Sequence, residues 1–480
     1  MSLLDRIIGA FSPEAEARRA HYRAVTETIR AHYSAAGYGR RSKTWVPSGS
    51  DADGASLRRQ RLAFITRDML RNTPYATRGQ QVIANNVVGD GIIPKAMSKN
   101  KSLQKRALEL FEAHLDTTAI DADGMNNLYG IQRIAIGSTV SDGEVLIRKR
   151  RRRISDGYPL PFQIQLLESD YIDSARDGSA ANGNVIREGI EFDKFGKRVA
   201  YYLFEEHPGA RVSWSRATAS RRVPAEQIIH MFRQDRPGQN RGVSWYAPTA
   251  LNLQDLGDHQ DAQLMRQKIA ACFAAFRTSL DADPSADLAD DMASSLQPGA
   301  IMSLAPGEDI KFGTPPGVDG FDEFTKVILR SVAAGLGITY EALTGDLSNV
   351  NFSSARMGRM EMDRNISSWQ WTMMIPQFCN RLSEWFMEAW MFQEQNNRML
   401  SQVKIGWVPP HRVLVDPTRE IPALGKKVEL GLASRSSVIR DLGYDPERVI
   451  EEIAADAEQE KKLGLRFGTS VYEQETTDDE

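Results

Sequence analysis

The residues best suited to chemistry are five aspartates in one short stretch of the chain, Asp281, Asp283, Asp287, Asp290 and Asp291. Converging aspartates can bind divalent cations, so the stretch could form the metal centre of a nuclease. Such sites usually gather carboxylates from separate elements, whereas these five follow one another in a turn-rich segment. We interpret them as a solvated acidic surface or a docking face for a basic partner. A metal-dependent nuclease remains the alternative.

Other catalytic signatures are absent from the sequence. There is no G-x-x-x-x-G-K-[ST] loop to cradle a nucleotide phosphate, and no H-E-x-x-H or C-x-x-C pair to bind zinc. The seven histidines are scattered, and His230 lies among apolar residues in IIHMF, which is typical of a core histidine. We therefore expect no enzyme activity, no cofactor and no bound metal.

A run of six cations, RKRRRR at residues 148–153, could bind phosphate groups. It would then make the protein a basic DNA-binding scaffold, which is the second alternative. The run lies between two strand-like segments, GEVLIRK and FQIQLLES. We expect it at the tip of a hairpin, paired with acidic residues.

A polar loop separates the two most helix-like parts of the chain. It contains Asn349, Asn351, Ser353 and Ser354, and Arg356 follows it. Asparagine and serine offer hydrogen bonds without fixed charge. Such a loop can contact passing DNA without the tight electrostatic binding that a lysine-rich loop would produce.

Four of the eight tryptophans lie on the segment that follows this loop: Trp369, Trp371, Trp385 and Trp390. Tryptophan-rich helices usually belong to a core or to a subunit interface. We expect these residues to form a packing spine and part of a contact between subunits.

The composition is that of a globular protein, with 480 residues, 41% hydrophobic and 26% charged residues, and a net charge of −3. This charge excludes a polycation that coats nucleic acid. Cys272 and Cys379 lie in apolar, helix-like contexts, and we expect both to be reduced. The sequence shows no membrane-spanning stretch and no signal peptide, so we expect synthesis in a cytoplasm.

The elements that must position these residues form an α+β fold. The pattern predicts helices at 12–33 and 56–90, the latter split at Pro74, and a small antiparallel sheet at about 143–233. A long helix follows at 246–277. A third helical segment leads to the polar loop, and a run from 355 to about 395 is expected to kink at Pro376. GAIMSL and EDIKFG are expected to pair as a hairpin within the acidic unit.

Several of these segments, in this order, resemble lambda-type bacteriophage portal proteins. The most specific is FTKVILRSVAAGLGITYEALTGDLSNVNFSSARMGRMEMDR, and RPGQNRGVSWYAPTALNLQDLGDHQDAQLMRQKIAACFAAF is also similar. LQPGAIMSLAPGEDIKFGTPP, LRRQRLAFITRDMLRNTPYATRGQQVIANNVVGDGIIP and VDPTREIPALGKKVELGLASRSSVIRDLGYDPERVIEE fit as well. The likeness covers about residues 15–465. His259, where tyrosine is expected, is a departure that bears on the packing of the long helices.

The resemblance implies a portal fold made of the following parts: a peripheral segment at 1–55 that is expected to be trimmed, a wing of helices and antiparallel sheet at 56–243, stem helices at 244–277 and 319–337, a clip at 278–318, a tunnel loop at 338–354, a wing spine helix at 355–400, a helical crown at 401–467 and an acidic tail at 468–480. Asn349, Asn351, Ser353, Ser354 and Arg356 would face the DNA. The five clip aspartates would meet partner proteins.

The resemblance also implies a role and partners. Twelve copies would form a ring at one capsid vertex of a virion assembled in the host bacterial cytoplasm. Double-stranded DNA would pass through the ring during packaging and ejection, without sequence-specific binding. The partners would be the terminase large subunit, head-completion and connector proteins, and the major capsid and scaffolding proteins, with no membrane involved.

Overall fold

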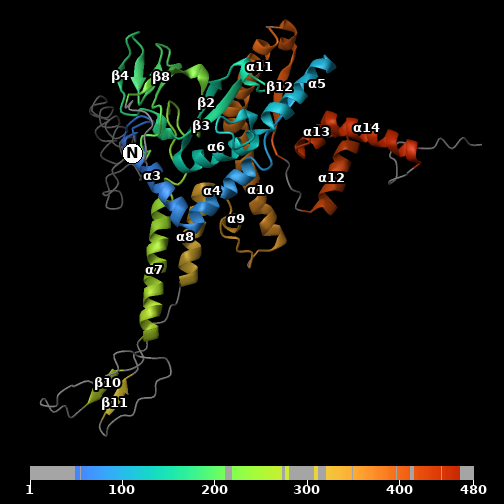
Figure 1. The fold of residues 1–480 in the computed structure, drawn as a ribbon. Coiled ribbons are helices and arrows are strands. Elements are labelled where there is room, and N and C mark those ends of the chain that lie inside the picture. The colour runs from blue at the N-terminus through green and yellow to red at the C-terminus, as the bar shows by residue number, and fades with distance from the viewer. Residues whose placement is uncertain are drawn as a thin grey trace, which may run out of the picture. The chain divides into compact units, whose positions relative to one another are not determined.

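The computed structural model describes residues 49–54, 56–210, 219–272, 276–279, 308–311, 321–348, 350–395, 397–410, 416–444 and 446–464 (Figure 1). The chain divides into two units, Met1–Gly54 and Ala55–Glu480. All described helices and strands belong to the second unit. None of these helices is long and apolar enough to cross a membrane. The helix expected at 12–33 lies outside the described residues.

The region predicted as the wing begins with three helices, α3 (Ser56–Asn72), α4 (Pro74–Val87) and α6 (Leu128–Asp142), which pack on one another. Pro74 occupies the first turn of α4, where its missing N–H costs no hydrogen bond, and this explains the predicted break. Between α4 and α6 lie strand β1 (Ile93–Met97), helix α5 (Lys101–Leu110) and a short π-helix, Phe111–Leu115.

Gly143 ends α6 with a φ of 96°. A Cβ atom there would lie 2.3 Å from the backbone carbon of Val243, so the position requires glycine. The close approach brings the segment that precedes the first long helix against the start of the sheet.

Within about residues 143–233, where one sheet was predicted, the strands form two antiparallel sheets. Three strands pair in the order β3 (Phe162–Leu167), β2 (Glu144–Arg151), β9 (Ile228–Phe232). Five more pair in the order β4 (Gly178–Ser179), β5 (Val185–Arg187), β6 (Ile190–Phe192), β7 (Arg198–Leu203), β8 (Arg221–Pro224). The sheets pack through a shared apolar cluster that includes Leu146, Ile190 and Tyr201. The prediction missed the split because β2 pairs with the distant β9.

Helix α7 (Ala250–Cys272) and helix α8 (Phe321–Leu336) correspond to the two predicted stem helices and pack against each other. α7 begins at Ala250, later than expected, and Trp245 and Tyr246 before it are fully buried in the core. Strands β10 (Phe276–Ser279) and β11 (Glu308–Lys311) pair in antiparallel register. Residues 299–304 lie outside the described residues, so the expected GAIMSL hairpin stays a prediction.

The spine is one continuous helical run of three segments: α10 (Phe352–Trp369), a π-helix (Gln370–Cys379) and α11 (Asn380–Gln393). The wider π-helical segment contains Pro376, at the position of the predicted kink. Its Met374, Phe378 and Cys379 are fully buried in the main core. Cys379 is a free thiol, as expected, and the side chain of Cys272 lies outside what the structure describes.

The C-terminal part returns to the wing before it becomes helical. Strand β12 (Lys404–Val408) pairs with β1, with Ile93 opposite Val408 and Met97 opposite Lys404. Helices α12 (Pro417–Glu429), α13 (Arg435–Asp441) and α14 (Pro446–Leu463) follow. Short 3-10 helices occupy Thr118–Ile120, Ile154–Asp156, Ser169–Tyr171, Ala225–Gln227 and Arg398–Gln402.

Candidate functional site

The two long helices, α7 and α8, contact each other through aromatic and polar side chains. The ring of His259 on α7 stacks on Phe321 of α8, with 5.5 Å between ring centroids, and tilts against Phe324 at 4.6 Å. Farther along, Asn252 Nδ2 donates a hydrogen bond to Ser331 Oγ at 3.1 Å. The expected departure at His259 is therefore a packing residue between the helices.

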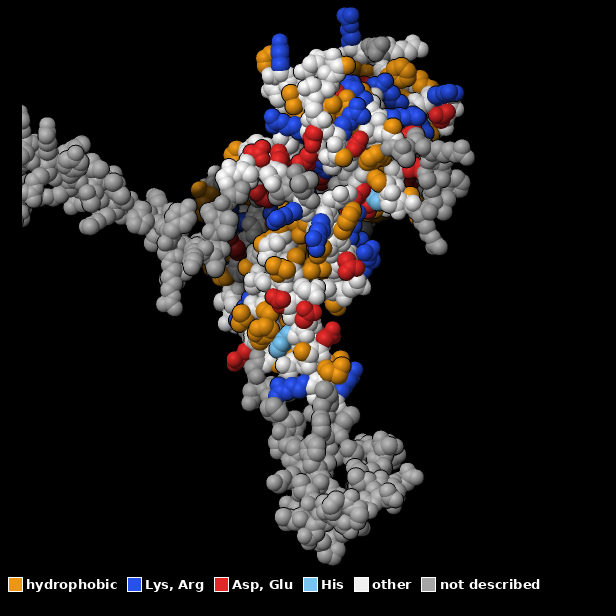
Figure 2. All heavy atoms as spheres, turned by 90° about the vertical axis from the view of Figure 1, so that its left-hand side faces the viewer, with side chains coloured by type: hydrophobic (Ala, Val, Ile, Leu, Met, Phe, Trp, Pro, Cys, Tyr) orange, Lys and Arg blue, Asp and Glu red, His pale blue; other side chains and the backbone are white. Residues whose placement is uncertain are grey.

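Several large apolar side chains on this pair remain exposed: Leu251, Leu264 and Met265 on α7, and Phe324 and Val327 on α8. Figure 2 shows hydrophobic side chains on the part of the molecule that carries these helices. Several large apolar side chains left exposed on one pair of helices are typical of a surface that contacts another protein.

The connection from α8 to α10 is a tight, polar structure. A short helix, α9 (Tyr340–Thr344), interrupts it, and Thr339 caps this helix by accepting a hydrogen bond from the Ala342 N–H at 3.1 Å. Asp346 then accepts hydrogen bonds from the Ser348 hydroxyl at 2.6 Å and the Ser348 N–H at 3.0 Å. These bonds hold the pKa of Asp346 below its usual value. Leu347, beside them, is 67% exposed.

Asn351 and Ser354, which were predicted to lie in the loop, form the start of α10. Asn351 Oδ1 accepts a hydrogen bond from the Ser354 N–H at 2.8 Å, and the Ser354 hydroxyl interacts with the Asn351 N–H at 3.3 Å. Asn351, Ser353 and Ser354 are all exposed, whereas Asn349 lies outside the described residues. Arg356 is one turn into the helix, and its Nη2 lies 3.8 Å from the carboxylate of Glu420 on α12. Four of the five predicted channel residues therefore lie together at the start of α10. The fifth, Asn349, lies outside the described residues.

The four spine tryptophans divide into buried and exposed residues. Trp385 and Trp390 are buried in the chain's own core, where Trp385 Nε1 donates to the Glu226 carbonyl at 2.8 Å and Trp390 Nε1 to Glu394 at 2.8 Å. Trp369 packs on Trp245 with ring centroids 4.8 Å apart. Trp371 alone of the four is more than half exposed, at 57%. A subunit contact in this conformation could use Trp371 but not Trp385 or Trp390.

The five aspartates predicted as a docking face, Asp281, Asp283, Asp287, Asp290 and Asp291, lie outside the described residues. Only strands β10 and β11 of that unit are described. The docking role of the aspartates stays a prediction.

The basic run is not at a hairpin tip. Arg148 to Arg151 belong to β2, the central strand of its sheet, and pair with β3 as far as Arg151 opposite Phe162. The sequence prediction placed the turn too early, because it treated the cations as loop residues although they continue the strand alternation.

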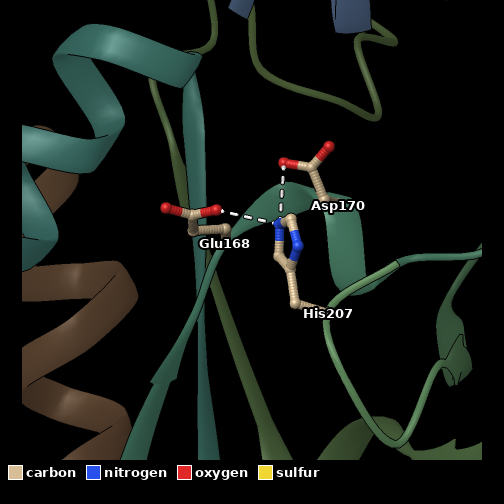
Figure 3. A group of neighbouring side chains, drawn as sticks. All are labelled: Glu168, Asp170 and His207. Carbon is tan, nitrogen blue, oxygen red and sulfur yellow. Dashed lines mark ion pairs between the residues drawn. The ribbon is translucent and has the colours of Figure 1, made fainter. Parts of the chain in front are cut away.

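One cluster among the described residues could hold a metal ion: Glu168, Asp170 and His207 (Figure 3). His207 Nε2 lies 3.1 Å from Glu168 Oε2 and 3.8 Å from Asp170 Oδ2. The guanidinium of Arg67 already contacts both carboxylates, with Nη2 2.5 Å from Asp170 Oδ2 and Nη1 3.4 Å from Glu168 Oε2. A cation at this position would meet the fixed charge of Arg67, so the residues fit an ion-pair cluster better than a metal centre.

Sequence reasoning missed a buried charge network in the wing. Glu144, fully buried on β2, accepts hydrogen bonds from Arg241 Nε at 2.8 Å and from the Gly242 N–H at 2.7 Å, and it contacts His230 Nε2 at 2.9 Å. Burial alone would raise the pKa of Glu144, but Arg241 and His230 outweigh it and hold that pKa well below its usual range. The one available signal was a glutamate beginning an apolar strand, in GEVLI.

The described residues thus include two long helices packed against each other and a polar turn that follows the second of them. The sequence model of a protein family, phage portal protein of the lambda family, matches residues 38–370. The chain belongs to the lambda family of phage portal proteins. Its likeness to other members of this portal family extends over almost the whole length of the chain.

Three portal proteins illustrate this. The probable portal protein of Halomonas phage phiHAP-1 is 27% identical over 97% of this chain and 94% of its own length. The portal protein of Escherichia phage N15 is 22% identical, covering 90% of this chain and 91% of that protein. Portal protein B of Escherichia phage lambda is 21% identical, covering 91% and 90%.

Solved structures with some likeness include two gene transfer agent necks. The neck of the native particle computed with C12 symmetry is 16% identical with a TM-score of 0.49, covering 84% of this chain and 96% of that chain. The neck of the empty particle computed with C6 symmetry is 16% identical with a TM-score of 0.49, covering 85% and 97%.

Proposed function

We propose that this chain forms a ring at one vertex of a phage capsid and that double-stranded DNA enters and leaves through the ring. Membership of the portal family supports this role. The exposed apolar side chains on α7 and α8 support assembly, because a ring repeats one heterologous contact from subunit to subunit until it closes. The role is structural: the chain conducts DNA and the energy for packaging comes from a separate motor.

In this proposal α7 and α8 are the stem helices, residues 338–354 are the tunnel loop, and the run from α10 to α11 is the wing spine. The segment around β10 and β11 is the clip, and its five aspartates, outside the described residues, are the docking surface for terminase and head-completion proteins. The helices α12, α13 and α14 form the crown. The ring also contacts the major capsid and scaffolding proteins.

The observation that carries the channel assignment is the turn between α8 and α10. Its exposed residues include Leu347, Ser348, Asn351 and Ser353, and no lysine or arginine occurs between Arg330 and Arg356. A surface of this kind offers passing phosphates short hydrogen bonds but no cation, so each contact is weak and brief.

The test is the mass and symmetry of the full-length protein, measured by light scattering and negative-stain electron microscopy. We expect a ring of about a dozen subunits around a central hole, as a closed heterologous assembly requires. The protein is also co-expressed with its scaffolding and capsid proteins. A chain that stays monomeric or forms a compact dimer under both conditions would contradict the proposal.

A further inference from the structure

The basic run is divided by the alternation of strand β2 into two different surfaces. Successive side chains of a strand point to opposite faces of the sheet. Lys149 and Arg151 lie on one face, whereas Arg148, Arg150 and Arg152 lie on the other. The backbone N–H of Arg152 still donates to the Pro161 carbonyl at 2.9 Å, so the pairing that fixes the alternation continues past Arg151.

The face of Lys149 carries one carboxylate for its two cations. Lys149 is buried, and its Nζ lies 2.7 Å from Glu388 on helix α11. Arg151 reaches the same carboxylate at 4.0 Å. The two cations share one carboxylate on α11. Lys149 is buried, so Arg151 is the one cation of β2 on this face that an added anion could reach.

On the face of Arg148, the two other arginines donate hydrogen bonds to neutral glutamine side chains. Arg150 Nε donates to Gln165 Oε1 at 2.9 Å, and Arg152 Nε donates to Gln163 Oε1 at 2.7 Å. Gln163 is itself fixed, because its Nε2 donates to the carbonyls of Ala119 and Asp121 at 2.9 and 2.8 Å. The glutamines orient the guanidinium groups without removing their charge.

No ion pair among the described residues joins Arg148, Arg150 or Arg152 to a carboxylate. The acidic group whose charge acts on Arg148, Glu205, lies 2.7 Å from Arg221, so that carboxylate is shared with another cation. Burial and the charge of Arg150 lower the pKa of Arg148, and burial and the charge of Arg152 lower that of Arg150. The three arginines repel one another and would gain from an added anion.

We propose that Arg148, Arg150 and Arg152 form a row that binds the phosphodiester backbone of double-stranded DNA. This contact is additional to the channel turn and does not depend on ring assembly. All three side chains are partly exposed. In Figure 2, Lys and Arg side chains gather on the part of the molecule that carries the strands.

The spacing of the row suits this partner. Alternate residues of a strand repeat about every 6.8 Å. Each strand of a DNA duplex carries one phosphate charge per about 3.4 Å of helix axis, so a row of three arginines can lie beside several phosphates at once. Arginine offers a planar fork of donors that matches the phosphate group. Gln165 accepts from Nε and Nη2 of Arg150 and Gln163 accepts from Nε of Arg152, so Nη1 of Arg150 and both Nη atoms of Arg152 can still donate to a phosphate. The row presents cations and no group suited to recognising a base, so we expect the binding to be independent of sequence.

The experiment measures binding of the full-length protein to a short fluorescent DNA duplex by anisotropy over a range of salt concentrations. The variant Arg148→Gln, Arg150→Gln, Arg152→Gln removes three phosphate contacts. The slope of log K against log salt should become shallower by about 2.7, at 0.9 per contact. Between about 50 and 200 mM salt the native protein should then lose about 40-fold more affinity than the variant.

Two further variants make the result specific. Arg187→Gln, Lys194→Gln, Lys197→Gln removes the same charge from exposed positions on β5 and on the turn between β6 and β7, and should leave the slope unchanged. The triple Arg→Lys variant at 148, 150 and 152 should retain most of the slope, because lysine still supplies point charges. Circular dichroism identifies any variant that fails to fold, and Arg150→Gln alone, with a slope change of about 0.9, then replaces it.

Several outcomes would overturn the proposal. An equal change in both charge-removing variants would mean a general effect of net charge, and an unchanged slope in the row variant would mean that the row does not contact DNA. Loss of slope in the lysine variant would indicate a structural role. A poly-glutamate peptide that binds the row while the duplex does not would assign it to an acidic protein.

Discussion

Asn351 Oδ1 accepts the Ser354 N–H at 2.8 Å, so two residues of the proposed channel surface also hold together the first turn of the spine helix. The polar character of the turn and the stability of α10 are therefore linked through the same side chains. Replacing Asn351→Ala should destabilise the protein by about 1 kcal/mol, the usual cost of a lost helix cap. Asn351→Asp should have almost no effect. Thermal unfolding of the two variants checks this, and equal stability of Ala and native protein would contradict it.

Adding cations to the turn without touching the cap should impair DNA passage. Leu347→Lys with Ser353→Lys places two new charges at exposed positions, and passing phosphates would bind them. We expect normal rings but reduced packaging in an assay of DNA protected from nuclease. Leu347→Gln with Ser353→Gln is the matched control and should package normally. Full packaging by the lysine variant would disprove the idea that the turn works by lacking positive charge.

The spine tryptophans should respond differently to mutation. Trp385→Ala opens a cavity in the core and should cost about 3–5 kcal/mol of unfolding free energy. Trp371→Glu changes an exposed side chain, so the subunit should fold with nearly native stability but assemble poorly if Trp371 contacts a neighbour. Urea unfolding and analytical ultracentrifugation separate the two effects. Native assembly of Trp371→Glu would remove this residue from the proposed interface.

Acid should weaken the wing through His114. This side chain is buried against Phe162, and burial lowers its pKa to about 4 from 6.5. Between pH 6.5 and 4 the unfolded chain takes up a proton that the folded chain does not, so stability falls as the pH falls through this window, by about 3 kcal/mol from this residue. His114→Leu should show a correspondingly flatter dependence on pH in chemical unfolding. An identical dependence in both proteins would exclude His114 as the cause.

The cluster of Glu168, Asp170 and His207 should be insensitive to metal removal. Arg67 contacts the two carboxylates and also Asp142, at 2.6 Å, so a chelator should leave the unfolding temperature unchanged. Arg67→Ala leaves the buried carboxylates of Asp142 and Asp170 without their cation and should cost about 3–5 kcal/mol of unfolding free energy. A fall in unfolding temperature on chelation, reversed by Zn²⁺ or Mg²⁺, would instead identify a metal centre.

The sequence predicted best those features that depend on neighbouring residues. The periodicity of apolar side chains located α8 and the run from α10 to α11, and Pro74 located the break between α3 and α4. Features that depend on distant partners were predicted less well. The split into two sheets follows from the pairing of β2 with β9, and the burial of Trp385 follows from the Glu226 carbonyl, more than a hundred residues earlier.

The charged residues show the same limit. Six adjacent cations looked like one surface, but strand alternation assigns Lys149 to Glu388 and Arg150 to Gln165, which are far apart in the sequence. In the same way the carboxylate of Glu144 could not be matched with Arg241 from local patterns. Sequence indicated which residues carry charge, and the tertiary structure decides which of those charges are satisfied.

The pairing of β1 with β12 has a consequence for biogenesis. Val408 lies opposite Ile93, and β12 is the partner of β1 within the described residues, so strand β1 stays unpaired until the ribosome has made most of the polypeptide. A nascent or truncated subunit therefore exposes an open strand edge that only its own late segment closes. Completion of synthesis thus becomes a condition for a finished wing, and prematurely terminated chains would be left as substrates for chaperones and proteases.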